Sequence, residues 1–241
     1  MDIYDDHGGF CVGACPDPCA DGKISGAQYF DGVSTGIDVL DDNDFDFTAN
    51  DDWTIEFWMK KDVPVGGGGT NDNEVIIGRD ERNGGVTLHW WLGVQSAAGG
   101  AIHFQLPDQS GVSTSIQGPK VDDGKWHHIV AIREGSKDNM SLYVDGTLAN
   151  SLSSFTTQSF ASVSNLNIGW MNLTGGYHYE GLLDEIAIYK RALTETEIRA
   201  HYYLARDYCG ICDTPVRIMP LGDSITYDNY GGQPDRDPYE R

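Results

Sequence analysis

The sequence contains no long hydrophobic run and few basic residues. No apolar stretch approaches the roughly 20 residues that span a bilayer, and residues 1–6 lack the basic and apolar regions of a signal peptide. Lys and Arg together number 16 against 37 Asp and Glu, which gives a formal net charge of −21. Phosphate contacts need clustered Lys and Arg, so this balance argues against a nucleic-acid partner. We therefore expect neither a membrane span nor nucleic-acid binding.

Cysteine is absent from the middle of the chain. All five cysteines lie near the two ends, at Cys11, Cys15, Cys19, Cys209 and Cys212. Disulfides would clip the start of the domain to its end, and they would indicate an extracellular chain. A zinc site is the alternative, because C-x₃-C-x₃-C with C-x₂-C supplies thiolates at loosely suitable spacing. The fifth thiol is either free or belongs to a pairing lost from a truncated chain.

The most distinctive motif of the sequence is Gly222-Asp223-Ser224, and no histidine follows it. The apolar run 216–221 predicts a strand that stops at Gly-Asp-Ser, a tight turn that would present the Ser224 hydroxyl. A serine nucleophile needs a base to take its proton. Only seventeen residues follow Ser224, and none is a histidine. We therefore expect no hydrolysis by this chain alone.

The same motif resembles the first block of the SGNH (GDSL-type) hydrolases. In that family the serine is the nucleophile, and its Asp and His partners lie near the end of the hydrolase domain. The resemblance implies that Ser224 is the nucleophile of an intact parent enzyme. It also implies that residues 207–241 are a Cys-containing linker followed by the start of a truncated hydrolase domain.

Short alternating segments between these ends predict strands. Residues 53–60 place four apolar side chains on one face and polar ones on the other, which predicts a half-buried strand. Asp145-Gly146 has the chemistry of a tight hairpin turn. The other expected strands are 75–77, 87–92, 101–106, 128–133, 141–144, 166–168 and 182–189.

One helix is expected, after the strands. Thr194 and Glu197 form a capping box, and Ile198 and Tyr202 would pack on the body of the domain. About a dozen strands without βαβ alternation predict a two-sheet sandwich. Residues 1–22 read as a Cys/Pro/Gly-rich linker with no regular element.

A series of motifs follows in an order typical of one family. They occupy 29–33, 53–60, 124–130, 142–146, 166–169, 181–189 and 191–194. In these motifs the chain resembles the laminin-G-like, concanavalin A-like lectin/glucanase superfamily over about residues 22–206. The resemblance implies an all-β fold at 23–206: a concanavalin A-like jelly-roll sandwich of two antiparallel sheets with one short C-terminal helix. It also implies carbohydrate binding, adhesion, or spacing beside a catalytic domain.

Catalysis by the sandwich itself is not expected. Some glucanases of this fold use two glutamates flanking an aspartate on one strand, because glycoside hydrolysis needs paired carboxylates at a defined separation. The nearest candidate here, Glu180 with Asp184 and Glu185, has the wrong spacing and order.

The resemblance implies a structural calcium ion bound by Asp31 and Asp184. Ca²⁺ prefers six to eight oxygens, so two carboxylates with backbone carbonyls would begin a site. The alternative is that Asp31 makes a turn before Gly32 and that Asp184 is hydrogen-bonded to backbone. The acidic run 41–46 does not fit an EF-hand loop, because the sharp-turn glycine and the twelfth-position glutamate are missing.

Aromatic residues outside the family's core pattern are the candidate sugar ligands. Stacking on a pyranose needs an aromatic platform with polar groups nearby. Adjacent tryptophans on one strand point to opposite faces, so one of the pair can be core while the other faces out. The candidates are Trp90, Trp91, Trp170, Tyr177 and Tyr179, the last two expected to be exposed in a Gly-rich loop.

Together these features predict a non-catalytic carbohydrate-binding module of a secreted multidomain SGNH-type esterase that acts on polysaccharide. The expected partner is a polysaccharide or glycan, the expected location is extracellular or at the cell surface, and the chain is expected to be a monomer. The alternative is a protein-binding adhesion or spacer module of a cell-surface protein.

Overall fold

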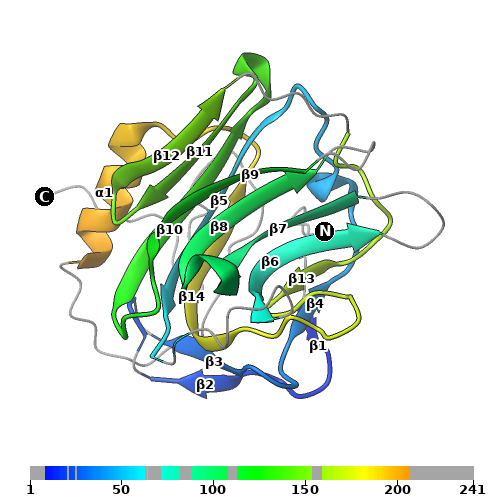
Figure 1. The fold of residues 1–241 in the computed structure, drawn as a ribbon, viewed down its shortest axis with the longest axis vertical. Coiled ribbons are helices and arrows are strands. Elements are labelled where there is room, and N and C mark those ends of the chain that lie inside the picture. The colour runs from blue at the N-terminus through cyan, green and yellow to red at the C-terminus, as the bar shows by residue number, and fades with distance from the viewer. Residues whose placement is uncertain are drawn as a thin grey trace, which may run out of the picture.

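The computed structural model describes residues 9–20, 22–24, 26–62, 64, 72–81, 88–107, 113–153 and 159–206. Two seven-stranded antiparallel sheets lie face to face (Figure 1), which confirms the predicted sandwich. We call them the front sheet, ordered β1-β4-β13-β6-β7-β8-β9, and the back sheet, ordered β12-β11-β10-β5-β14-β3-β2. The predicted hydrolase start at 207–241, with Cys209, Cys212 and Ser224, lies outside the described residues.

The strands have the following bounds. The front sheet contains β1 (Gly9–Cys11), β4 (Ile37–Val39), β13 (Leu166–Ile168), β6 (Glu74–Glu81), β7 (Leu88–Gln95), β8 (Ala101–Pro107) and β9 (Ser113–Lys120). The back sheet contains β12 (Thr147–Ser153), β11 (Asn139–Val144), β10 (Trp126–Glu134), β5 (Asp52–Lys60), β14 (Glu180–Tyr189), β3 (Ala27–Asp31) and β2 (Asp17–Cys19). Short 3-10 turns occur at η1 (Asn43–Phe45), η3 (Ser96–Ala98) and η4 (Gly135–Lys137), and α1 spans Glu195–Arg206.

One hydrophobic core fills the space between the sheets. Trp53 on β5 lies at its centre and is fully buried. Its ring stacks on Phe47 at 4.9 Å between centroids and meets Trp90, Phe104 and Phe160 at 5.7 to 5.9 Å. Aromatic pairs at these separations contribute about 0.5–1.5 kcal/mol each beyond the area that they bury. Trp53 therefore joins strands of both sheets.

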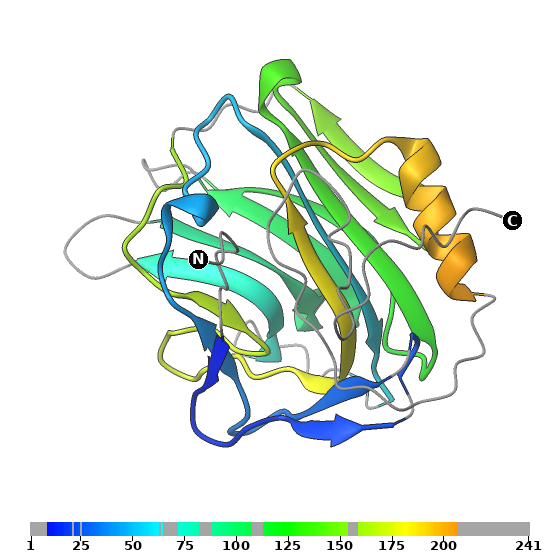
Figure 2. The ribbon, with the colours of Figure 1, turned by 180° about the vertical axis from the view of Figure 1, so that it is seen from behind.

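The central strand β5 is buried on both faces, so the prediction of a half-buried strand was wrong. Thr54, Glu56 and Trp58, on the face predicted to be polar, are all buried. Helix α1 packs on one side of this outer face of the back sheet (Figure 2), with Ile198 in a buried cluster with Val130, Ile132, Ala187, Tyr189 and Leu193.

The helix begins as the sequence predicts. Thr194 Oγ1 accepts from the Glu197 N–H at 3.3 Å, and the Glu197 carboxylate accepts from the Thr194 N–H at 2.7 Å. The capping box is therefore confirmed. With 12 residues α1 is too short to cross a bilayer, and none of the described helices qualifies as a membrane span.

The first 22 residues contain two strands that the sequence analysis did not expect. β1 pairs with β4 in the front sheet, and β2 pairs with β3 in the back sheet. A disulfide joins Cys11 to Cys15 across the connection between them. Cys19 forms no disulfide within the described chain. The disulfide rules out Cys11 and Cys15 as thiolate ligands of the alternative zinc site.

Strands β9 and β12 were also missed, because their sequences are mostly polar. Every residue of β12 is exposed, so its sequence lacks the alternation that marks a half-buried strand. Its pairing with β11 comes instead from the hairpin turn at Asp145-Gly146, where both residues have positive φ.

Buried Arg79 explains the acidic run that the sequence analysis left without a function. Its guanidinium lies inside the sandwich and is fully buried. It pairs with the carboxylates of Asp41 and Asp46, and donates to the carbonyls of Phe45, Ser162 and Ser164. The run at 41–46 therefore neutralises a buried cation.

Substitution of Arg79 by Met should lower the free energy of unfolding by about 3 kcal/mol, because it leaves two carboxylates and three carbonyls without their donor. Urea denaturation would measure the loss. Arg199→Met is the matched control, since Arg199 pairs with Glu195 on the exposed surface of α1 and should change stability by less than about 1 kcal/mol. Similar losses in the two variants would contradict the role of Arg79.

Candidate functional site

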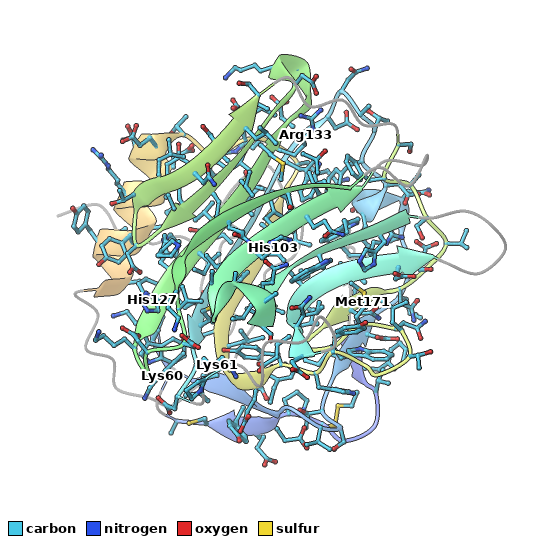
Figure 3. All side chains as sticks on the ribbon, in the orientation of Figure 1. Lys60, Lys61, His103, His127, Arg133 and Met171 are labelled. Atoms are coloured by element: carbon cyan, nitrogen blue, oxygen red, sulfur yellow. A yellow bond between two sulfur atoms is a disulfide. The ribbon has the colours of Figure 1, made fainter. Side chains whose placement is uncertain are left out.

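The outer face of the front sheet carries the strongest candidate site. On β7 and β8, alternate side chains enter the core: Trp90, Leu92, Val94, Ile102, Phe104 and Leu106. The residues between them, Trp91 and His103, therefore project to the opposite face. Figure 3 shows His103 near the middle of this sheet.

Trp91 and His103 form the floor of this face, and both are buried, with exposed fractions of 5% and 3%. Their rings stack with centroids 4.7 Å apart and planes inclined by 28°. The Gln105 side chain interacts with the His103 ring and opposes the effect of burial on its pKa. Burial lowers the pKa of His103 to about 4, so the ring is neutral at pH 7 and offers one N–H donor and one acceptor.

Three glutamine amides surround this floor. Gln105 lies opposite Trp91 in the β7–β8 register, and Gln117 lies opposite His103 in the β8–β9 register. The side chains of Gln95 and Gln117 are hydrogen-bonded to each other. Each amide supplies both donors and an acceptor at a partly or fully exposed position. We call these five residues the Trp91 surface.

A loop covers the far side of Trp91. Between β13 and β14 the chain places Met171 against Trp91 and Val75, and Leu173 and Tyr177 pack on this small cluster. Tyr177 has a φ of 48°, in the left-handed region that few non-glycine residues adopt. The structure thus brings together two of the predicted aromatic residues, Trp91 and Tyr177.

The other predicted aromatic residues lie elsewhere. Trp90 belongs to the core, which agrees with the prediction that one of the two adjacent tryptophans can be a core residue. Trp170 is half-buried at the edge of the front sheet, where its indole N–H donates to Asp38 at 2.9 Å and its ring stacks on His178. The expected exposure of Tyr179 was wrong: the residue is fully buried, because its ring packs against Phe30 in the core.

Sequence reasoning missed the polar part of the Trp91 surface. His103 and Gln105 occur in the segment 101–106, which was predicted as a strand. Their alternation with Ile102 and Phe104 was the signal that could have placed both on one outer face. Gln117 could not have been found in this way, because β9 was not predicted.

The two predicted calcium ligands lie apart. The β3–β14 register pairs Asp31 with Glu180, which places Asp184 four residues further along β14, about 13 Å away at 3.3 Å per residue. They therefore do not fit a single ion. Within the described part of the chain, no group of three His, Cys, Asp or Glu residues is arranged to hold a metal.

Each of these aspartates has local partners instead. Asp31 Oδ1 accepts from the N–H groups of the turn residues 33–35 at 2.8 to 2.9 Å. Asp184 Oδ2 accepts from the Lys23 and Ile24 N–H groups at 2.8 Å. These contacts are those of the alternative interpretation, and a calcium requirement stays a prediction.

The fold and these motifs together agree with one family. Residues 30–199 match the family model described as the concanavalin A-like lectin/glucanases superfamily (Laminin_G_3). The chain belongs to this superfamily. No curated protein sequence matches it.

Solved structures with a similar fold include several binding domains. Domain 4 of AbnA, a GH43 extracellular arabinanase from Geobacillus stearothermophilus, in complex with arabinotriose, is 21% identical (TM-score 0.59; 83% of this chain, 92% of that chain). CBM40 of the Ruminococcus gnavus IT-sialidase, bound to α2,3 sialyllactose, is 15% identical (TM-score 0.51; 63% and 83%). The binding domain of Paraclostridial Mosquitocidal Protein 1 is 17% identical (TM-score 0.62; 82% and 47%), so this chain spans about half its length. At these identities the likeness concerns the fold.

The depressed pKa of His103 predicts an acid-sensitive contribution to stability. An unfolded histidine binds a proton near pH 6.5, whereas His103 in the folded chain does so near pH 4. The unfolded state therefore binds more protons in this window, and stability should fall by about 2 kcal/mol between pH 7 and 4.5. Urea denaturation at both pH values should show this additional loss in the wild type relative to His103→Gln. Equal losses would contradict a buried neutral His103.

Proposed function

We propose that this domain binds carbohydrate on the Trp91 surface and does not cleave it. The observation that carries the proposal is the group of three partly or fully exposed glutamine amides beside the buried Trp91–His103 stack, on the outer face of the front sheet. Sugar hydroxyls are both donors and acceptors, which matches neutral amides and a neutral imidazole. The solved relatives in complex with arabinotriose and sialyllactose support a sugar ligand for this fold.

The proposal includes an extracellular location for the domain and an SGNH-type esterase as its parent protein. A disulfide between Cys11 and Cys15 is consistent with an oxidising, extracellular environment. If Ser224 is the nucleophile of an SGNH-type esterase, the domain would hold that enzyme near an acylated polysaccharide and raise its effective concentration there.

Binding to soluble and insoluble polysaccharides, each with calcium and with EDTA, tests the sugar site. Gln105→Ala should weaken retention on the bound polymer about five- to tenfold, since one hydrogen bond contributes about 1 kcal/mol. Gln28→Ala, on β3 of the back sheet, is the matched control and should bind like the wild type. Loss of retention with EDTA would support calcium. No retention on any polymer would favour the adhesion or spacer function.

The proposed absence of catalysis is tested with a nitrophenyl acetate ester. Hydrolysis by the wild-type chain should equal that by Ser224→Ala, because no histidine follows Ser224 to act as its base. A clear excess in the wild type would contradict the expectation that Ser224 is inactive in this chain.

A further inference from the structure

A pocket of about 300 Å³ lies between helix α1 and the outer face of the back sheet, on the opposite side of the sandwich from the Trp91 surface. Strands β5, β10 and β14 form its floor, and α1 forms its outer wall (Figure 2). Its volume is at the small end of the range for ligand pockets. The apolar part of the lining consists of Ile24, Trp58, Ala187, Leu204 and Ala205.

Glu56 organises the polar part of the pocket. Its carboxylate accepts hydrogen bonds from His128 Nε2 at 2.7 Å, His201 Nδ1 at 2.9 Å and Tyr189 Oη at 2.9 Å. Burial alone would raise the pKa of Glu56, but the hydrogen bonds from the two histidines outweigh it and hold the pKa at about 2. This carboxylate is therefore ionised and occupied by protein donors, and it joins the sheet to the helix.

His128 is left with one unmatched nitrogen. The ring is 1% exposed, and its Nδ1 has no hydrogen-bond partner in the described chain. Nε2 donates to the Glu56 carboxylate, so Nδ1 is the ring nitrogen that is left without a partner.

Glu185 is a second unmatched group in the lining. A bulge in β14 turns this residue out of register with β5, and its φ of 51° lies in the left-handed region. No hydrogen bond or ion pair joins its carboxyl to another described residue. Burial, followed by the charges of Asp184 and Glu56, raises the pKa of Glu185 to about 7. A cation beside this carboxyl would neutralise the negative charge that it carries when it is ionised.

Trp58 supplies an aromatic wall that already contacts a cation. The Lys23 ammonium lies over its ring, 4.9 Å from the centroid. Such contacts are attractive because the ring face is electronegative. His128 and Tyr202 stack beside the same indole and fix its position.

We propose that this pocket binds a primary alkylammonium ion. Its ammonium group would pair with the Glu185 carboxylate, and its alkyl chain would lie against Trp58 and Leu204. The lining group without a hydrogen-bond partner is the Glu185 carboxyl, whose charge is unfavourable for a carboxylate or phosphate ligand. A neutral alcohol would fill the apolar part but would leave Glu185 without a counter-charge.

Titration with n-pentylammonium, followed by calorimetry at pH 8 where Glu185 is ionised, tests the proposal. We expect a dissociation constant of about a millimolar or tighter. Pentan-1-ol, of the same length, should bind at least tenfold more weakly, and pentanoate should not bind measurably. Equal affinity for pentylammonium and pentanol, or no binding of pentylammonium, would overturn the proposal.

Two variants separate the pocket from general attraction of cations to an acidic protein. Glu185→Gln keeps the side-chain shape and should weaken pentylammonium binding at least tenfold. Glu195→Gln removes an exposed carboxylate of α1 that does not line the pocket, and it should leave the affinity unchanged. In a two-dimensional NMR titration the indole N–H of Trp58 should shift and that of Trp91 should not. Equal effects of the two variants, or a shift confined to Trp91, would overturn the assignment.

Discussion

A basic side chain that this sandwich buries needs a counter-charge in the interior, because an unpaired buried charge costs several kcal/mol. Cations are scarce in a chain with 16 basic and 37 acidic residues. The buried basic side chains lie where separate segments of the chain meet. Arg79 joins β6 to the segments 41–46 and 162–164. Lys61, which follows β5, pairs with Glu74 on β6 of the other sheet at 2.8 Å. Figure 3 shows Arg133 and Lys61 at opposite ends of the sandwich. Arg133 binds Asp138 and the Asn139 carbonyl there.

At Glu56, histidine side chains take the place of Lys or Arg as hydrogen-bond donors to a buried carboxylate. Glu56 would be unpaired on the central strand, and His128 from the neighbouring strand and His201 from α1 supply its donors. This explains why the helix docks on this face: its apolar contacts at Ile198 act together with a charge-assisted hydrogen bond. Glu185 lies beside the same cluster, where burial and then the charges of Asp184 and Glu56 raise its pKa to about 7.

The sequence predicted the sandwich and its main strands because alternation and turn chemistry are local signals. It could not predict which of two strand faces meets a distant element. Residues 53–60 therefore read as half-buried although α1 covers their second face, and Tyr179 read as exposed although its ring lies beside Phe30 in the core. The candidate site was found only in part for the same reason. Trp91 was identifiable as one of an adjacent pair, whereas its stack on His103 depends on the β7–β8 register.

The two outer faces of the sandwich differ in charge, and this difference separates their ligands. The Trp91 surface combines a neutral imidazole with amides, so it offers donors and acceptors without net charge. A ligand rich in hydroxyl groups can satisfy such a surface without leaving an ion unpaired. The pocket under α1 instead offers the Glu185 carboxyl, whose pKa is about 7, next to the aromatic ring of Trp58. A sugar would leave that carboxyl uncompensated, whereas an ammonium group would pair with it, so the two sites should not compete for one ligand.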